Sequence, residues 1–460
     1  MPRPNILYVF TDQQSANMMS CTGNPWLQTP AMDRLAARGV RFERAYCTNP
    51  VCLPSRFSMI TGRMPSFAGF RSNDWQLETP GIPEPVFNNG LGTLFKAAGY
   101  DAVYGGKTHL PGFEPDRLGF DILTYDEREH LASSCADFIR SRDGSKPYLL
   151  YVSLINPHDI CFMAIQDGND PMLLKSDEFA KKFNLTQEQI DAFLTGPRQL
   201  DTVLAEAADL ATDDLPPLPA NHQPQAGEPE AIDIMLDQRP FRRNARENYD
   251  ERRWRLHRWA YCRLTELVDR QLGLILDALE DSGQADNTVI IFTSDHGDHD
   301  SAHKLEHKDA PYEEACRIPL IVVEPQAWSE SGNSRFAAVD GKNLVSNGLD
   351  LIPTLCDYAG FAHPDATLSG RSILPLVSGV TPAGWRTVVP VESEFGRAIV
   401  TAEYKYVEYF EGARCEQLYD LKNDPGETRN ALEDDHLQGV LSELHQAFNQ
   451  LYSGGDVQPS

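Results

Sequence analysis

The residues of this chain best suited to chemistry lie in the run Cys52-Leu53-Pro54-Ser55-Arg56, which continues to Thr61-Gly62-Arg63. Pro54 is typical of the first turn of a helix, so we expect Cys52 at a helix N-terminus, where the helix dipole and free N–H groups attract an anion. Arg56 follows one helical turn later and would direct its guanidinium at the same place. Cys47 lies upstream, but no second Cys or His pair follows to complete a zinc site. The run therefore predicts an anion-binding cradle around position 52.

Polar clusters also follow four short apolar runs that are typical of buried strands. They are Asp12-Gln13 after Ile6–Phe10, Lys107-Thr108-His109 after Ala102–Tyr104, Asn156-Pro157-His158 after Tyr148–Ile155, and Asp295-His296 after Val289–Thr293. Ligands of open α/β sheets bind beyond the carboxyl ends of the strands. The four clusters are therefore expected to meet at one site.

Helical patterns separate these strands, together with a fifth expected parallel strand, Ile318–Val323. The expected helices are Pro30–Arg38 with Thr29 as its N-cap, Leu91–Ala98, Arg253–Leu279 and Leu349–Tyr358. Such alternation predicts an α/β fold with a large, mostly parallel central sheet flanked by helices.

The pattern changes after Gly379 to short strands and a closing helix, expected at 387–391, 398–401, 405–410 and 432–452. We therefore predict a catalytic α/β domain over residues 1–379 and an α+β subdomain over 380–460. Residues 159–250 are acidic and proline-bearing, with one short helix expected at 186–195. Long irregular insertions often serve as binding loops, so this one is expected to shape the substrate pocket.

The Cys52–Arg63 run resembles the signature Cys-x-Pro-Ser-Arg…Thr-Gly-Arg of the type I sulfatases, members of the alkaline phosphatase superfamily. The resemblance extends from about residue 4 to about residue 450. It implies the alkaline phosphatase-like sandwich with a small C-terminal antiparallel sheet and helix, and oxidation of Cys52 to formylglycine. A formylglycine-generating or anaerobic sulfatase-maturing enzyme would then be a partner.

A divalent metal ion is the implied cofactor, held by Asp12, Gln13, Asp295, His296 and the modified Cys52. Oxygen-rich ligation suits Ca²⁺, Mn²⁺ or Mg²⁺ better than Zn²⁺. Gln13 and His296 stand where many sulfatases have Asp and Asn, and this variant resembles the choline sulfatase and phosphonate monoester hydrolase branches. It removes one negative charge, which weakens the case for Ca²⁺ and strengthens that for Mn²⁺.

The resemblance also assigns roles to the remaining polar residues. Arg56 would hold the nucleophile, Lys107 would bind sulfate, and His109 would hydrogen-bond the hydrated aldehyde. His158 and Lys308 would contact the leaving oxygen. Asn73, in a polar turn, and His303, which follows the Asp295 run, are weaker candidates for substrate binding; a turn-forming Asn is an equally good interpretation of the first.

The implied reaction is hydrolysis of an organic sulfate ester to an alcohol and inorganic sulfate. One hydroxyl of the hydrated aldehyde attacks sulfur, and the second then loses its proton so that sulfate is expelled. The alternatives are a phosphonate monoester or phosphodiester hydrolase using the same residues, and a non-catalytic anion-binding relative.

Composition narrows the partners of this 460-residue chain, which has a formal charge of −26 from 41 basic and 67 acidic residues. Such a charge repels nucleic acid and anionic membranes. Nine scattered cysteines and an N-terminus without the layout of a signal peptide favour a cytoplasmic enzyme. The substrate is expected to be a small-molecule or saccharide sulfate ester, and a homo-oligomer is compatible with the sequence. Trp75, Trp254 and Trp259 could stack on a sugar or surround a quaternary ammonium group, with at least two expected in the core.

Overall fold

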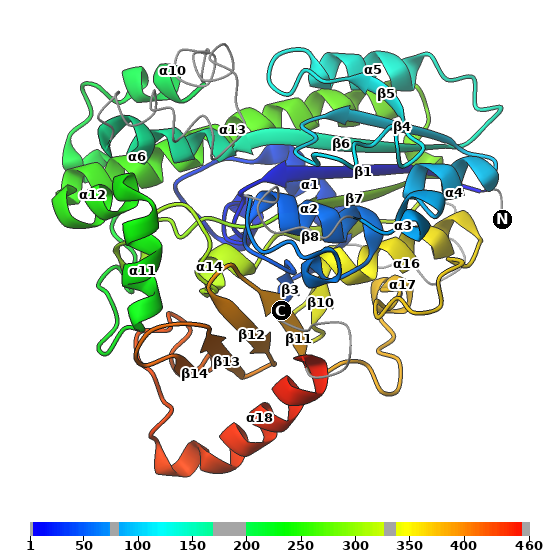
Figure 1. The fold of residues 1–460 in the computed structure, drawn as a ribbon. Coiled ribbons are helices and arrows are strands. Elements are labelled where there is room, and N and C mark those ends of the chain that lie inside the picture. The colour runs from blue at the N-terminus through cyan, green and yellow to red at the C-terminus, as the bar shows by residue number, and fades with distance from the viewer. Residues whose placement is uncertain (1–2, 74–81, 169–198, 326–336, 453–460) are drawn as a thin grey trace.

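The computed structural model describes residues 3–73, 82–168, 199–325 and 337–452 (Figure 1). Its centre is an eight-stranded sheet in the order β5-β4-β6-β1-β7-β8-β2-β9. The strands are β1 (Asn5–Asp12), β2 (Val40–Phe42), β4 (Asp101–Gly106), β5 (Asp121–Thr124), β6 (Tyr148–Pro157), β7 (Thr288–Ser294), β8 (Leu320–Val323) and β9 (Ala338–Asp340). A two-stranded sheet joins β3 (Ala45–Tyr46) and β10 (Val345–Ser346). The mostly parallel α/β fold predicted from the sequence is confirmed.

One strand of the predicted parallel set runs the other way. β8 pairs antiparallel with both β7 and β2, so the interpretation of 318–323 as a parallel strand is wrong. A fully buried apolar run has the same composition in either direction, because both faces are covered in each case.

Side chains of β1 alternate between two cores, one on each face of the sheet. Tyr8 lies in the core beneath helices α2 (Cys52–Thr61), α4 (Leu91–Ala97) and α16 (Asn347–Ala359). Val9 lies in the opposite core, beneath α1, α5 and α13. These three helices are α1 (Pro30–Arg38), α5 (Leu131–Arg140) and α13 (Glu251–Asp281). Both faces are therefore buried, which explains why the central strands are continuous apolar runs.

The start of α1 corrects one local expectation. Thr29 precedes the helix, but its side chain does not cap it. Asp269 of α13 does so instead, accepting hydrogen bonds from the backbone N–H groups of Ala31 and Met32 at 3.0 and 2.8 Å. Asp269 lies 238 positions from Ala31 in the chain, so local sequence could not reveal the cap.

The described parts of 159–250 are more helical than expected. They form α6 (Cys161–Gly168), α10 (Gln199–Glu206), α11 (Glu230–Gln238) and α12 (Pro240–Asn248). The helix predicted at 186–195 lies outside the described residues, as does Trp75. Trp254 is buried, as expected for a core tryptophan, whereas Trp259 is half-buried.

A four-stranded antiparallel sheet and the helix α18 (Gln438–Tyr452) form the C-terminal part, at the bottom of Figure 1. Its strands are β11 (Val389–Glu392), β12 (Gly396–Val400), β13 (Tyr404–Tyr409) and β14 (Glu416–Asp420). Val391 and Val407 belong to the same apolar core as Tyr8. The small sheet is thus continuous with the main core, and the domain boundary at residue 379 stays a prediction.

A buried lysine joins this sheet to the main body. The ammonium group of Lys405 lies 2.8 Å from carboxylate oxygens of both Glu313 and Glu427 and donates to the carbonyl of Pro311 at 3.0 Å. Glu427 also accepts the backbone N–H of Glu313 at 2.6 Å. The two carboxylates raise the pKa of Lys405 against the effect of burial, which taken alone would lower it.

Replacing Lys405 by Met should destabilise the protein by about 3–5 kcal/mol, because two buried carboxylates would lose their cation. Thermal unfolding followed by circular dichroism measures the change. Lys422→Met is the matched control, since Lys422 pairs with Glu403 at the exposed surface and such pairs contribute little. Equal midpoints for the two variants would contradict this role for Lys405.

Candidate active site

The carboxyl ends of β1 and β7 bring two carboxylates, one imidazole and one thiol together. Ligand atoms of Asp12, Cys52, Asp295 and His296 all lie within 4.8 Å of one another, and the four side chains are buried. Cys52 is the first residue of α2, as the position of Pro54 predicted. Its sulfur lies 3.2 Å from Nε2 of His296 and 3.6 Å from Oδ1 of Asp12.

Cations hold the outer oxygens of both aspartates and leave the inner oxygens facing this centre. Arg56 donates at 2.8 Å to Oδ2 of Asp12 and at 2.8 Å to Oδ2 of Asp295. Lys107 donates to the same Asp12 oxygen at 2.6 Å. The Oδ1 atoms lie 3.8 and 3.6 Å from Nε2 of His296. Each aspartate therefore presents one oxygen inward in a fixed position.

A hydrogen bond also fixes the orientation of the His296 imidazole ring. Nδ1 of His296 lies 2.8 Å from the carbonyl of Gly297, an acceptor that requires the proton on Nδ1. Against the effect of burial, Asp295 raises the pKa of His296. In the neutral ring that metal binding requires, Nε2 would carry its lone pair toward Asp12 and Cys52. A backbone carbonyl commonly fixes a metal-binding histidine in this tautomer.

These donors fit a divalent cation. Two inward carboxylate oxygens and an imidazole nitrogen make a mixed, oxygen-rich set that suits Mn²⁺, Mg²⁺ or Ca²⁺. Asp12, Asp295 and His296 would hold the ion. The identity of the metal stays a prediction.

A ring of nitrogen-bearing side chains surrounds the Cys52 sulfur. Lys308 donates to it at 3.0 Å, and His109 and His158 lie close enough to interact with it electrostatically. Burial alone would raise the pKa of this thiol, but Lys308, Lys107 and His296 outweigh burial and hold the pKa well below its usual value. The ring thus stabilises negative charge at position 52.

Burial and charge also set the ionisation of the neighbours. Burial, reinforced by Lys107, lowers the pKa of His158 to about 4, so this ring is neutral at pH 7. Burial raises the pKa of Asp295 to about 6, and repulsion from Asp12 contributes to this rise. Burial and repulsion from Cys52 oppose the ionisation of Asp12 as well, but the cations Lys107 and Arg56 keep its pKa below the ordinary range.

Gln13 lies in the active site, but its amide oxygen contacts Lys308 and Cys161, whereas the sequence predicted a contact with the metal ion. Its Oε1 accepts from Lys308 at 2.7 Å and from the thiol of Cys161 at 3.0 Å, while its Nε2 donates to Asp298 at 2.6 Å. The Asp298 carboxylate, an acceptor, fixes which end of the amide faces Lys308. Metal ligation by Gln13 stays a prediction, and its observed contact is with the lysine.

The two weaker candidates for substrate binding, Asn73 and His303, make different contacts. The side-chain oxygen of Asn73 accepts the backbone N–H of Leu53 at 3.1 Å, so it caps the helix that starts at Cys52. His303 is buried and stacks on Tyr312, with ring centroids 4.0 Å apart. Neither nitrogen of the His303 ring has a hydrogen-bond partner among the described residues. Substrate binding by Asn73 and His303 stays a prediction.

Two residues without an assigned role complete the centre. Asp298 orients Gln13, and Cys161 donates to the same amide oxygen as Lys308. Asp298 lies in the run that carries Asp295 and His296, which could have suggested it. Cys161 had no signal in the sequence beyond its position three residues after His158.

Comparison with known proteins agrees with this geometry. The sulfatase family profile matches residues 4–361, and the profile of the N-sulphoglucosamine sulphohydrolase C-terminal region matches 301–454. The chain belongs to the sulfatase family, and the protein is a sulfuric ester hydrolase of the alkaline phosphatase superfamily.

Relatives of several specificities align over nearly the whole chain. A Δ4,5-hexuronate-2-O-sulfatase of Bacteroides thetaiotaomicron is 28% identical, with 97% of this chain and 88% of the relative covered. A choline-sulfatase of Rhizobium meliloti is 27% identical over 94% and 83% of the two chains. The solved structure of a 2-O GAG sulfatase has a TM-score of 0.78 at 26% identity, covering 98% of this chain and 92% of the other. Phosphonate monoester hydrolase of Agrobacterium radiobacter, at TM-score 0.72 and 20% identity, shares the fold, with 98% of this chain and 96% of that chain covered.

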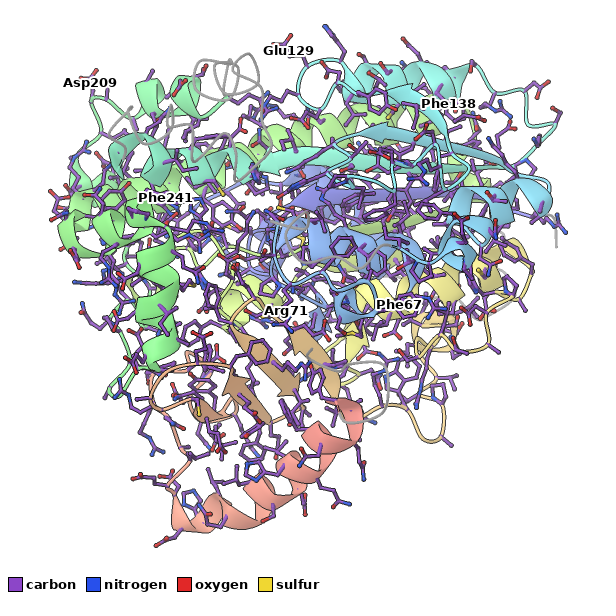
Figure 2. The ribbon with its side chains drawn as sticks, in the orientation of Figure 1. Phe67, Arg71, Glu129, Phe138, Asp209 and Phe241 are labelled. Atoms are coloured by element: carbon purple, nitrogen blue, oxygen red, sulfur yellow. The ribbon has the colours of Figure 1, made fainter. Side chains whose placement is uncertain are left out.

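Replacing Asp298 by Asn should lower kcat/KM on a sulfate ester by about 10–100-fold, the range for groups that orient active-site residues. The new amide can donate as well as accept, so Gln13 is free to turn its nitrogen toward Lys308. Steady-state kinetics gives the loss, and Asp209→Asn, an exposed aspartate at the edge of the molecule (Figure 2), serves as the control. Unchanged kinetics in a correctly folded Asp298→Asn protein would show that the amide needs no such support.

Proposed function

We propose that this protein hydrolyses sulfate esters carried on a saccharide, with Cys52 converted to formylglycine and one divalent cation. The observation that carries the proposal is the position of the Cys52 sulfur, which lies beside three metal-ligand candidates and within a ring of Lys308, His109 and His158. Several relatives support a saccharide substrate by name, among them N-acetylglucosamine-6-O-sulfatase and ulvan-active sulfatase.

The side chains around position 52 differ in charge, and their roles in the proposed reaction differ accordingly. Lys107, which pairs with Asp12, and Lys308, which donates to the Cys52 sulfur, are the cations that would bind the sulfate oxygens and neutralise the leaving oxygen. His158 is neutral and can hydrogen-bond the ester without adding charge. Arg56 is fully engaged by Asp12 and Asp295, so it holds the metal-ligand candidates in place rather than contacting substrate.

The bound cation would supply a fixed positive charge that lowers the pKa of a hydroxyl at position 52. The residues around it keep the site dry, since Asp12, Cys52 and Asp295 are all fully buried. In such surroundings the electrostatic stabilisation of a developing anion is stronger than in water.

We also propose that the enzyme acts in the cytoplasm.

A second function deserves testing because of the Gln13 and His296 variant. The same side chains could act on phosphonate monoesters or phosphodiesters, and the fold is shared with a phosphonate monoester hydrolase. Comparison of kcat/KM on an aryl sulfate, an aryl phosphonate monoester and an aryl phosphodiester separates the two functions. Elemental analysis of the purified enzyme identifies the metal as Mn²⁺, Ca²⁺ or Mg²⁺.

Active enzyme should contain a Cys52 peptide that is ~18 Da lighter than the encoded sequence, the change from thiol to aldehyde in an activated nucleophile. Peptide mass spectrometry measures the shift. Cys52→Ala should abolish turnover, whereas Cys47→Ala, which alters a buried cysteine outside the metal-ligand group, should retain it. Full activity from a protein whose Cys52 is entirely unmodified would refute the proposed nucleophile.

Replacing Lys308 by Ala should lower turnover of an alkyl sulfate by about 10²–10⁴-fold, as expected for a group that neutralises the leaving oxygen. The loss on 4-nitrophenyl sulfate should be much smaller, because 4-nitrophenolate leaves without help. Lys304→Ala, in the same loop and only half-buried, is the matched control. Equal losses on both substrates would place Lys308 elsewhere in the reaction.

A further inference from the structure

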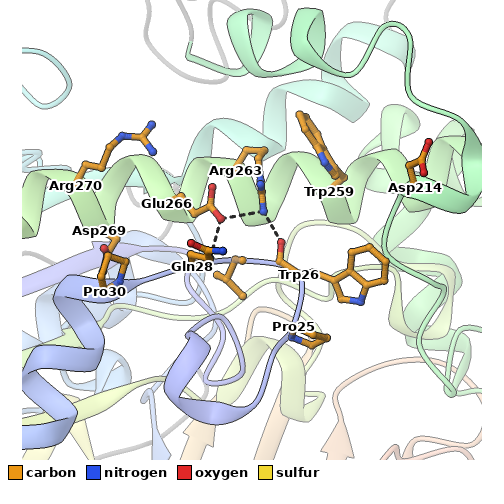
Figure 3. A pocket seen from close by; sticks show the side chains of 11 residues that line it. Pro25, Trp26, Gln28, Pro30, Asp214, Trp259, Arg263, Glu266, Asp269 and Arg270 are labelled. Carbon is orange, nitrogen blue, oxygen red and sulfur yellow. Dashed lines mark hydrogen bonds and ion pairs between the residues drawn. The ribbon is translucent and has the colours of Figure 1, made fainter.

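A second pocket, separate from the active site, lies between helix α13 and the loop before α1 (Figure 3). It has a volume of about 610 Å³. Its lining residues include Trp26, Asp214, Trp259, Arg263, Glu266 and Arg270. None of them belongs to the group around Cys52.

Helix α13 separates the two sites. Tyr261 points to the active-site side, where its hydroxyl donates to the backbone carbonyl of Gln13 at 2.6 Å. Trp259 and Arg263, two residues before and after, line the pocket. An α-helix is about 10–12 Å across with its side chains, so the pocket lies roughly one helix diameter from the Gln13 loop.

Two half-buried indoles form the apolar part of the pocket. Trp26 comes from the loop and Trp259 from α13, and Figure 3 shows both with their rings drawn. Neither indole N–H has a protein acceptor among the described residues. A large aromatic face with a free N–H at its edge suits a ligand that is apolar on one face and hydroxylated at its rim.

A fixed polar network forms the rest of the wall. Arg263 donates to the carbonyl of Trp26 and pairs with Glu266 at 2.9 Å. Glu266 also accepts the backbone N–H of Gln28 at 2.8 Å. The Arg263 guanidinium lies over the Trp259 ring, 5.5 Å from its centroid. These contacts hold the wall in one conformation before a ligand arrives, which reduces the cost of binding.

The pocket carries charges of both signs: Arg263 and Arg270 are basic, whereas Asp214, Glu266 and Asp269 are acidic. Because the two signs nearly balance, the charges favour a ligand without a net charge of its own. Donors and acceptors in near balance, beside aromatic faces, match a pyranose ring, whose C–H face is apolar and whose hydroxyl groups both donate and accept.

We propose that this pocket is an auxiliary binding site for an unsulfated pyranose unit of a saccharide chain. The inference rests on the proposed saccharide specificity, since a chain that supplies sulfate esters to the active site also carries unsulfated units. Its role would be to hold the enzyme on the polymer between turnovers.

The test uses the full-length Cys52→Ala protein and calorimetric titration with unsulfated hexasaccharides prepared from heparin, chondroitin and chitin. At least one should bind, and the Trp26→Ala/Trp259→Ala double variant should bind it about tenfold more weakly or not at all. Trp259→Phe keeps an aromatic face and should retain most of the affinity. Leu274→Ala, an exposed position farther along α13, is the matched control and should bind normally.

Three results would overturn the proposal: no binding by any of the hexasaccharides, equal binding by the double variant, or binding of sulfated heparin hexasaccharide alone that 0.5 M salt abolishes. A dimer in light scattering that the double variant dissociates would assign the pocket to an interface between copies and would overturn it as well.

Different results would contradict the proposed sulfatase function and the proposed saccharide-binding pocket. In the background with Cys52 intact, the double variant should hydrolyse 4-nitrophenyl sulfate within about twofold of the unaltered protein, because none of its changes touches the active site. Saccharide binding without sulfate release from any saccharide would refute the proposed function and leave the pocket assigned.

Discussion

The double ion pair of Arg56 with Asp12 and Asp295 is the interaction on which the site depends. Two carboxylates a few ångströms apart in a dry interior repel each other strongly unless a cation is shared between them. Arg56 supplies that cation on the outer side, at 2.8 Å from each aspartate. The inner oxygens then face the centre of the site, and that of Asp295 is held there by the backbone N–H groups of Gln13 and His296 at 3.0 and 2.8 Å. The position of α2 follows, because Arg56 and Cys52 lie on consecutive turns of it.

Several features of the site could be predicted because short-range chemistry determines them. Pro54 placed Cys52 at the start of a helix, and the polar ends of the apolar runs placed Asp12, Lys107 and Asp295 at one edge of the sheet. Parallel strands align their carboxyl ends whatever their order in the chain, so convergence did not require knowledge of the strand order.

Other features depend on contacts that no local pattern contains. Asp269 caps α1 across 238 positions of the sequence, and Asp298 orients Gln13 across 285 positions. The direction of β8 is decided by its connection and partners, since its buried composition is the same either way. The amide of Gln13 has two polar ends, and the direction in which it points depends on neighbours from three separate segments.

The Lys405 cluster has a consequence for the order in which the protein is made. Cys52 is completely buried, and the segment that carries Lys308 toward it is braced from the C-terminal sheet, by Lys405 at Pro311 and by Ser393 at the carbonyl of Asp309. Every charged group of the active site therefore precedes Ser393 and Lys405 in the chain, and these two later residues support the Lys308 segment. The cluster of Lys405, Glu313 and Glu427 can form only after these C-terminal residues have been synthesised, so the support for the Lys308 segment on this side is added last.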